Sequence, residues 1–282
     1  MSYWSRNDIE VLADSILLDC FHEEYAVDHM ATNIDKLAAD YLHLSVSYMK
    51  LSDDGRILGL TTYKDVNVEF CRNSHKEILP VKKDSMLVEK DLLENNNGRR
   101  RFTVAHEAAH QVIFRTDSSG SAKLNYLKQL PNKASYSCHE LKSAEEWCEW
   151  QANSLGAALL MPETSLDYWM YRFHPKGPLI RYGRRFAYRD GETINSLMKT
   201  LGVSRTALII RLGQLGYICQ RPETEYADPL DIIPNDDEVN VTCVIDPQLH
   251  FSDHWGYEAG RYQHHCYGPV FQKPEKSEMY IK

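Results

Sequence analysis

Two histidines and a glutamate form an HExxH motif at His106, Glu107 and His110. In an α-helix, side chains four residues apart lie on one face about one turn apart, so both imidazoles can present a nitrogen to one zinc ion. Glu107 would then lie beside the metal, where it could accept a proton from a metal-bound water. The spacing therefore predicts metal-assisted hydrolysis, with His106 and His110 as ligands and Glu107 as the general base.

The alternative for such a pair is a helix in which both histidines are partly buried and hydrogen-bonded. The neighbouring residues favour the metal site, because an apolar stripe runs beside the pair, as expected for a helix at the floor of a site. The stripe consists of Ala105, Ala108, Ala109, Val112 and Ile113.

A catalytic zinc site needs a third protein ligand and an open position for water. Three acidic candidates, Glu145, Glu146 and Glu149, begin a second predicted helix that Pro162 ends. Asn153 follows Glu149 by one turn, where its side-chain oxygen could accept the outer N–H of a ligating histidine. Glu145 and Glu146 fit a solvated first turn at the positive end of the helix dipole and stay as alternatives. We predict Glu149 as the third ligand, with Asn153 orienting a histidine.

Residues 100–110 read RRFTVAHEAAH, and residues 149–162 follow the pattern E-x-x-A-N-x-L-G-x-x-L-L-M-P. These segments resemble the ImmA/IrrE family of metallopeptidases, whose signatures are close to R-R-F-T-x-A-H-E-x-G-H and E-x-x-A-N-x-F-A-x-x-L-L-M-P. The likeness extends from about residue 7 to about residue 216. Ala109 replaces the usual glycine and Leu155-Gly156 replaces Phe-Ala, so the packing near the metal differs from the family pattern while every ligand is retained.

The resemblance implies an α+β, mainly helical fold: a thermolysin-like, zincin-like core with a small sheet, followed by a helix-turn-helix-like module. Past the region of resemblance we predict a C-terminal extension. It implies helices near residues 8–19 and 33–42, a strand around 46–48, and segment 84–92 directly before the motif helix. The same resemblance implies His106, His110 and Glu149 as metal ligands and Glu107 as the catalytic base.

Members of that family are soluble regulatory proteases that cleave helix-turn-helix repressors and thereby derepress genes. The activity implied for this chain is therefore a zinc-dependent endopeptidase acting on such a repressor. Manganese is a second candidate metal, since two imidazoles and a carboxylate accept several divalent ions.

A basic segment follows the second motif. From Tyr171 to Arg211, nine lysines and arginines stand against two acidic residues, a local balance of +7 in a chain whose net charge is −8. Aromatic residues are interleaved with these charges, so the segment could meet nucleic acid or an acidic protein. It could equally be a basic surface that balances acidic neighbours on the same fold.

Gly202-Val203-Ser204 resembles the turn and N-cap of a helix-turn-helix. The predicted second helix offers only Arg205 and Arg211 as charges that could read a DNA groove. We therefore expect the module to complete the fold or to grip the repressor, with direct DNA recognition as the less favoured alternative. Its predicted packing residues are Leu197, Leu201, Val203, Leu208 and Leu212.

Three parts are predicted along the chain: a metallopeptidase domain at 1–170, a basic helix-turn-helix-like module at 171–219, and an acidic linker with a C-terminal extension at 220–282. Residues 223–238 suit a linker, and residues 239–245 alternate like a strand. A second zinc site in the extension is not favoured, because no CxxC pair or standard histidine spacing supports it. Its candidate ligands would be Cys243, His250, His254, His264, His265 and Cys266.

Composition predicts a cytoplasmic protein with no membrane partner. The first residues carry no apolar signal region, and no window approaches 18 uninterrupted apolar residues. Seven cysteines are scattered without a disulfide framework, which fits free thiols in a reducing compartment.

Three classes of function are compatible with these patterns. The first is the zinc endopeptidase; the second is a metal-dependent binding or sensor protein that displaces a repressor without cleavage; the third is a DNA-binding regulator. The hydrolytic reading also requires a donor to the developing oxyanion, which the sequence does not identify. The candidates are Tyr126, Tyr136, His139, Tyr171 and His174.

Overall fold

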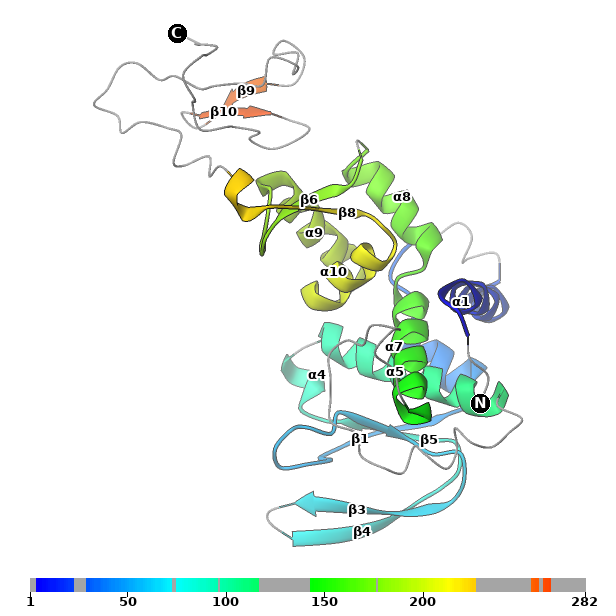
Figure 1. Cartoon of the computed structure of the whole chain (residues 1–282). Coiled ribbons are helices and arrows are strands. Elements are labelled where there is room, and N and C mark those ends of the chain that lie inside the picture. Colours follow the sequence, from blue (N-terminus) through cyan, green and yellow to red (C-terminus); the bar gives the residue numbers. More distant parts are fainter. Residues whose placement is uncertain are drawn as a thin grey trace. The chain divides into compact units, whose positions relative to one another are not determined.

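The computed structural model describes residues 4–22, 29–72, 75–95, 97–116, 143–175, 177–226, 255–258 and 261–264 (Figure 1). These residues form an α+β fold, as predicted. The chain divides into two compact units, one of residues 1–167 and 198–208 and the other of residues 168–197 and 209–282. Residues 198–208, which belong to the predicted helix-turn-helix-like module, are therefore part of the first unit.

The helices and strands of the first unit lie mostly ahead of residue 160. Its helical elements are α1 (Arg6–Phe21), α3 (Ile34–Lys36), the π-helical turn η1 (Leu37–Tyr41), α4 (Leu92–Asn95), α5 (Asn97–Thr116) and α7 (Ala144–Leu160). Its strands are β1 (Ser45–Met49), β2 (Gly59–Thr61), β3 (Val66–Arg72), β4 (His75–Val81) and β5 (Ser85–Glu89). The helix predicted near residues 8–19 and the strand predicted around 46–48 are confirmed as α1 and β1, and the helix expected at 33–42 consists of α3 and η1.

A three-stranded sheet with the order β1-β5-β2 supports the motif helix α5. β5 lies in the middle, parallel to β1 and antiparallel to β2, which is an edge strand of this sheet among the described residues. Met86 and Val88 of β5 are fully buried, and the residue between them, Leu87, belongs to a separate apolar cluster. Because successive side chains of a strand point to opposite faces, β5 contributes to packing on both faces of the sheet.

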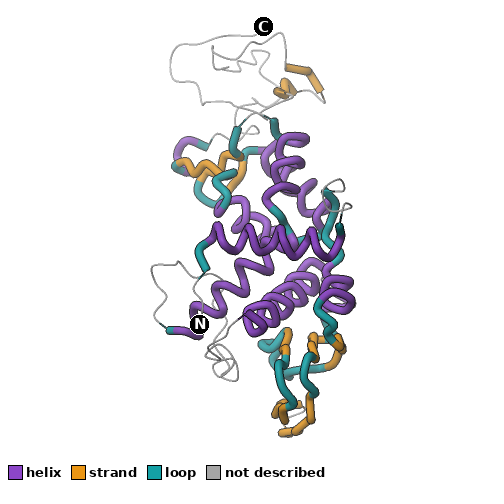
Figure 2. Tube along the Cα trace, turned by 90° about the vertical axis from the view of Figure 1, so that its right-hand side faces the viewer, coloured by secondary structure: helices purple, strands orange, loops and turns teal. Residues whose placement is uncertain are grey.

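An antiparallel pair, β3 and β4, packs against one face of this sheet, and Figures 1 and 2 show it on the side away from α5 and α7. Phe70 and Val81 from the pair meet Leu51 and Leu87 in one cluster of buried apolar side chains. The sequence analysis did not identify these two strands, since their burial depends on the sheet that they cover.

Helices α5 and α7 approach each other closely at Gly156. A Cβ atom at this position would lie 3.1 Å from the backbone carbon of Ala105 and 3.1 Å from the backbone nitrogen of His106. Gly156 lies two turns after Glu149 on the same helix face, so the close approach brings the two motif segments together. α7 itself begins at a capping box formed by Ser143 and Glu146 and ends directly before Met161-Pro162.

We expect Gly156→Ala to lower the free energy of unfolding by about 1–3 kcal/mol, because the added methyl group meets buried helix backbone that cannot move aside. A matched control is Gly191→Ala in another helix, where a Cβ atom has nothing within 4 Å. That control should raise stability by about 0.5–1 kcal/mol through helix propensity. Urea unfolding of the metal-free protein checks both changes, and equal effects from the two substitutions would contradict the close packing.

The first arginine of the motif segment fixes the start of α5 to two other elements. Arg100 donates from Nη1 and Nη2 to the carboxylate of Asp35 over 2.7 and 2.9 Å, and Nη1 also donates to the hydroxyl of Tyr48 over 2.8 Å. The bidentate geometry sets the orientation of the side chain. Arg100 thus ties α5 to α3 and to β1.

The second arginine is buried and binds backbone carbonyls. Arg101 donates from Nε to the oxygen of Gly202 over 3.0 Å and from Nη2 to the oxygen of Thr32 over 2.8 Å. Burial lowers the pKa of its guanidinium, although the nearby charge of Asp35 opposes this effect. The contact with Gly202 attaches α5 to the turn that begins after Leu201, the last residue of α9 (Tyr188–Leu201).

The second unit combines helices with a small sheet of the order β7-β6-β8, in which β6 pairs parallel with β8. Helices α8, α9 and α10 contribute to both units, because the division falls within each of them. These elements are α8 (Glu163–Phe173), β6 (Leu179–Tyr182), β7 (Arg185–Phe186), α9 (Tyr188–Leu201), α10 (Arg205–Gln214), β8 (Ile218–Arg221), the 3-10 turn η3 (Glu223–Glu225), β9 (Trp255–Glu258) and β10 (Arg261–His264).

The segment predicted as a helix-turn-helix forms two helices, α9 and α10, joined by Gly202-Val203-Ser204. Gly202 has a φ of +62°, the left-handed conformation that favours glycine after a helix, and the Ser204 hydroxyl accepts a bond from the backbone of Ala207. Arg211 is only 3% exposed, so it is not available to read a groove. The predicted packing residues are all buried: Leu197, Leu201, Val203, Leu208 and Leu212.

The C-terminal predictions lie largely beyond the described residues. The strand predicted at 239–245 and the cysteines and histidines of the disfavoured second zinc site are in segments, or have side chains, that the structure does not describe. Within the described part of the chain, no helix combines the length and apolar character needed to cross a membrane.

Candidate metal centre

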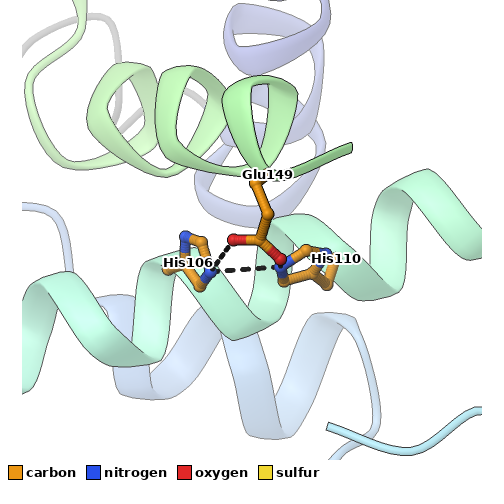
Figure 3. A group of neighbouring side chains, drawn as sticks. All are labelled: His106, His110 and Glu149. Atoms are coloured by element: carbon orange, nitrogen blue, oxygen red, sulfur yellow. Dashed lines mark hydrogen bonds and ion pairs between the residues drawn. The ribbon is translucent and has the colours of Figure 1, made fainter. Parts of the chain in front are cut away.

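Three side chains from two helices converge at the centre of the first unit. His106 and His110 come from α5 and Glu149 comes from α7, and Figure 3 shows all three pointing toward one another. One Glu149 oxygen lies 3.4 Å from Nε2 of His106 and the other lies 3.3 Å from Nε2 of His110. The two Nε2 atoms are 3.1 Å apart. The structure thus brings together the three residues predicted as ligands.

The spacing of these atoms fits a divalent cation. Ligand atoms that lie 2.0–2.1 Å from a tetrahedrally coordinated zinc are about 3.3 Å from one another. The distance between the two Nε2 atoms, 3.1 Å, is close to such an edge length, and each of these nitrogens lies 3.3 or 3.4 Å from a different oxygen of the Glu149 carboxylate. Among the described residues, this is the group of histidines, cysteines and carboxylates whose ligand atoms gather closely enough to hold a metal ion.

The charges of the cluster favour a cation. Burial alone would raise the pKa of Glu149, but the facing imidazoles of His110 and His106 outweigh it and hold that pKa well below its usual range. Burial alone would lower the pKa of His106, yet the contact with Glu149 and the charge of Glu107 raise it. The site therefore favours positive charge between these groups, which a divalent ion can supply.

Glu107, the predicted base, lies under the edge strand β2. Its side chain is buried, and a Cβ atom placed on Gly59 would come within 2.7 Å of Oε1 of Glu107 and within 2.7 Å of a methyl carbon of Thr103. The carboxylate therefore lies in space that any other residue at position 59 would occupy. The sequence analysis did not single out Gly59, because an isolated glycine in a strand carries no signal of what lies against it.

Gln111, directly after the predicted ligand His110, binds the same strand to α5. Its amide nitrogen donates to the hydroxyl of Thr61 over 2.7 Å and to the carbonyl of Thr62 over 2.8 Å. Both contacts are buried. The strand β2, the predicted base and the two predicted histidine ligands are thus joined along a turn and a half of α5.

Asn153 lies on the α7 face that meets α5 and has a small raising effect on the pKa of His106. Nδ1 of His106 is nonetheless buried without a partner at hydrogen-bonding distance among the described residues. The role of Asn153 in orienting a ligating histidine stays a prediction.

The two alternative carboxylates stand in the first turn of α7. Glu146 accepts a bond from the backbone nitrogen of Ser143 over 3.1 Å and completes the capping box. Glu145 is part of the same turn. Neither belongs to the cluster of ligand atoms, in contrast to Glu149.

The candidates for an oxyanion donor are only partly described. Tyr126, Tyr136 and His139 lie outside the described residues. In the second unit, Tyr171 is 77% exposed, and the buried His174 lies 3.7 Å from the carboxylate of Asp190, which also accepts a bond from the backbone of Ile180.

Comparison with known protein families agrees with this geometry. The model of the IrrE N-terminal-like domain, which defines the peptidase family M78, matches residues 64–213 and includes both motif segments. A search of curated proteins gave no match. Because the matched region holds more than half of the residues, the chain belongs to the M78 family of metallopeptidases.

Proposed function

We propose that the chain is a zinc-dependent endopeptidase that hydrolyses a peptide bond in a regulatory protein, a helix-turn-helix repressor, and so derepresses genes. The observation that carries the proposal is the convergence of His106, His110 and Glu149 beside the buried carboxylate of Glu107. The choice of a repressor as substrate rests on the resemblance to the ImmA/IrrE family.

His106, His110 and Glu149 would hold the zinc ion, or manganese in its place, and leave one position open. When bound, the ion supplies a Lewis acid that polarises the scissile carbonyl and lowers the pKa of water from 15.7 toward about 7. Glu107 accepts the proton of the attacking water and later returns it to the leaving amine. Because Glu107 is buried against Gly59, its carboxylate is restricted to one position.

The edge strand β2 offers a way to position the substrate. β2 pairs with β5 along one side, and in the described part of the chain no strand pairs with its other side. An extended peptide can add to such an edge through main-chain hydrogen bonds. Since Gly59 of β2 lies against Glu107, a peptide bound there would pass close to the base and to the ligand cluster.

A cleavage assay tests the proposal. The purified protein, loaded with Zn²⁺, is incubated with the helix-turn-helix protein encoded beside its gene, and fragments are identified by mass spectrometry. We expect one or a few defined cuts that a chelator abolishes and added Zn²⁺ restores. Intact repressor under all conditions, with derepression in cells still present, would instead favour a protein that displaces the repressor without cutting it.

We expect Gly59→Ala to lower the cleavage rate by about 100-fold while Zn²⁺ affinity stays unchanged. The new methyl group takes the place of the Glu107 carboxylate, and a displacement of about 1 Å at a catalytic group can cost this much. Steady-state kinetics and chelator competition measure the two quantities. Gly191→Ala serves again as the control, and wild-type kinetics for Gly59→Ala would contradict the close contact between Gly59 and the base.

A further inference from the structure

The residue next to Glu149 contacts the opposite edge of a ligand imidazole. Cys148 is buried, and its Sγ atom lies 3.7 Å from Nδ1 of His110. The other ring nitrogen of His110, Nε2, faces Glu149 over 3.3 Å. Successive side chains on a helix point about 100° apart, so neighbouring residues of α7 can hold the two edges of one ring between them.

The position of the proton on His110 decides whether it can bind a cation. A neutral imidazole carries one N–H, and Nε2 offers its lone pair only when the proton is on Nδ1. Nδ1–H then points at Cys148 and can donate to the sulfur, at a distance suited to this larger acceptor. Metal-ligating histidines usually donate this outer N–H to a carboxylate, a backbone carbonyl or water, and a thiol is a weaker acceptor than these.

The two histidines differ in how they are held. The ring of His110 stacks on Phe114 with 5.7 Å between ring centroids and 24° between the planes, and its outer nitrogen has the contact with Cys148. The outer nitrogen of His106 has no such contact among the described residues. The ring of His110 thus has one contact on its face and another at its outer nitrogen.

We propose that Cys148 is a positioning residue of the metal centre: its thiol accepts a hydrogen bond from Nδ1–H of His110 and holds the ring in the tautomer whose Nε2 faces the cation. This inference rests on the proposed metal centre. It makes the affinity for Zn²⁺ depend on a side chain that does not touch the ion.

The test compares Zn²⁺ affinity, measured by competition with a chromophoric chelator, in the full-length protein and three variants. Cys148→Ala and Cys148→Val both remove the acceptor, and valine also refills the buried volume. We expect both to weaken Zn²⁺ binding by about 10-fold or more, the range seen when an outer partner of a ligating histidine is lost. Cys219→Ala, which removes another described free thiol, should leave the affinity unchanged.

A measurement on the wild-type protein does not depend on how the variants fold. In the zinc-loaded protein, NMR should show the Nδ1–H proton of His110 with nuclear Overhauser effects to the β protons of Cys148. Absence of these Overhauser effects, or wild-type affinity in Cys148→Val, would overturn the role of Cys148 and leave the metal centre standing. Absence of Zn²⁺ binding in the wild type and in Cys219→Ala alike would overturn the metal centre and this inference with it.

Discussion

Glu107→Gln should abolish measurable cleavage of the repressor, with the rate lowered by about 10²–10⁴-fold, the usual contribution of a positioned general base. Glutamine keeps the shape and burial of the side chain but cannot accept the proton of the attacking water. The ligand atoms of His106, His110 and Glu149 are unaltered, so Zn²⁺ should still bind with wild-type stoichiometry. Cleavage kinetics and elemental analysis of the same preparation check the two halves of this expectation.

The same variant separates hydrolysis from displacement. If the protein acts by cleavage, the Glu107→Gln variant should bind the repressor without derepressing the genes that the repressor controls. Derepression at the wild-type level in cells that carry only Glu107→Gln would contradict the hydrolytic function and favour a metal-dependent binding protein. Loss of the bound metal in this variant would show that Glu107 contributes to the ligand set.

Glu149→Ala should weaken Zn²⁺ binding by more than about 100-fold. This exceeds the loss expected for an outer partner, because a direct ligand is removed and the two imidazoles lose the negative charge that faces them. Chelator competition on the folded protein measures the affinity, and the cleavage rate should fall in parallel at limiting Zn²⁺.

Glu145→Ala is the matched control for this change. Glu145 is in the first turn of the same helix but outside the cluster of ligand atoms. Its removal should leave Zn²⁺ affinity unchanged and cost only a few tenths of a kcal/mol through the helix dipole. A loss of affinity in Glu145→Ala comparable to that in Glu149→Ala would mean that the third ligand has been misassigned.

Sequence reasoning reached the ligand cluster because its strongest signal is local. The spacing of His106 and His110 follows from the period of a helix and needs no knowledge of the rest of the fold. Glu149 required a further step, since three carboxylates begin the same helix. The one-turn spacing to Asn153 selected Glu149, and the structure places Glu149 against the histidines and Glu146 in the capping box.

The contacts that surround the cluster were beyond sequence reasoning. Gly59 lies against Glu107, although about fifty residues of chain separate them. Arg101 donates to the carbonyl of Gly202, which lies near the C-terminal end of the region that the family model matches. Each of these contacts depends on which strands pair and how closely two helices approach, so no pattern within a short window reports them.

Motif spacing and turn chemistry were enough to predict the family, the helix that carries two predicted ligands and the predicted base, and the turn residue Gly202 between two later helices. Contacts between distant elements were needed to show that β2 lies at the edge of the described sheet over Glu107, that Gly156 lets α7 approach α5, and that Cys148 faces the outer nitrogen of His110. The two kinds of feature differ in how far along the chain their causes act. Helical period and turn chemistry act over a few residues, whereas the convergence of side chains from separate elements is set by sheet register and close packing across the whole unit.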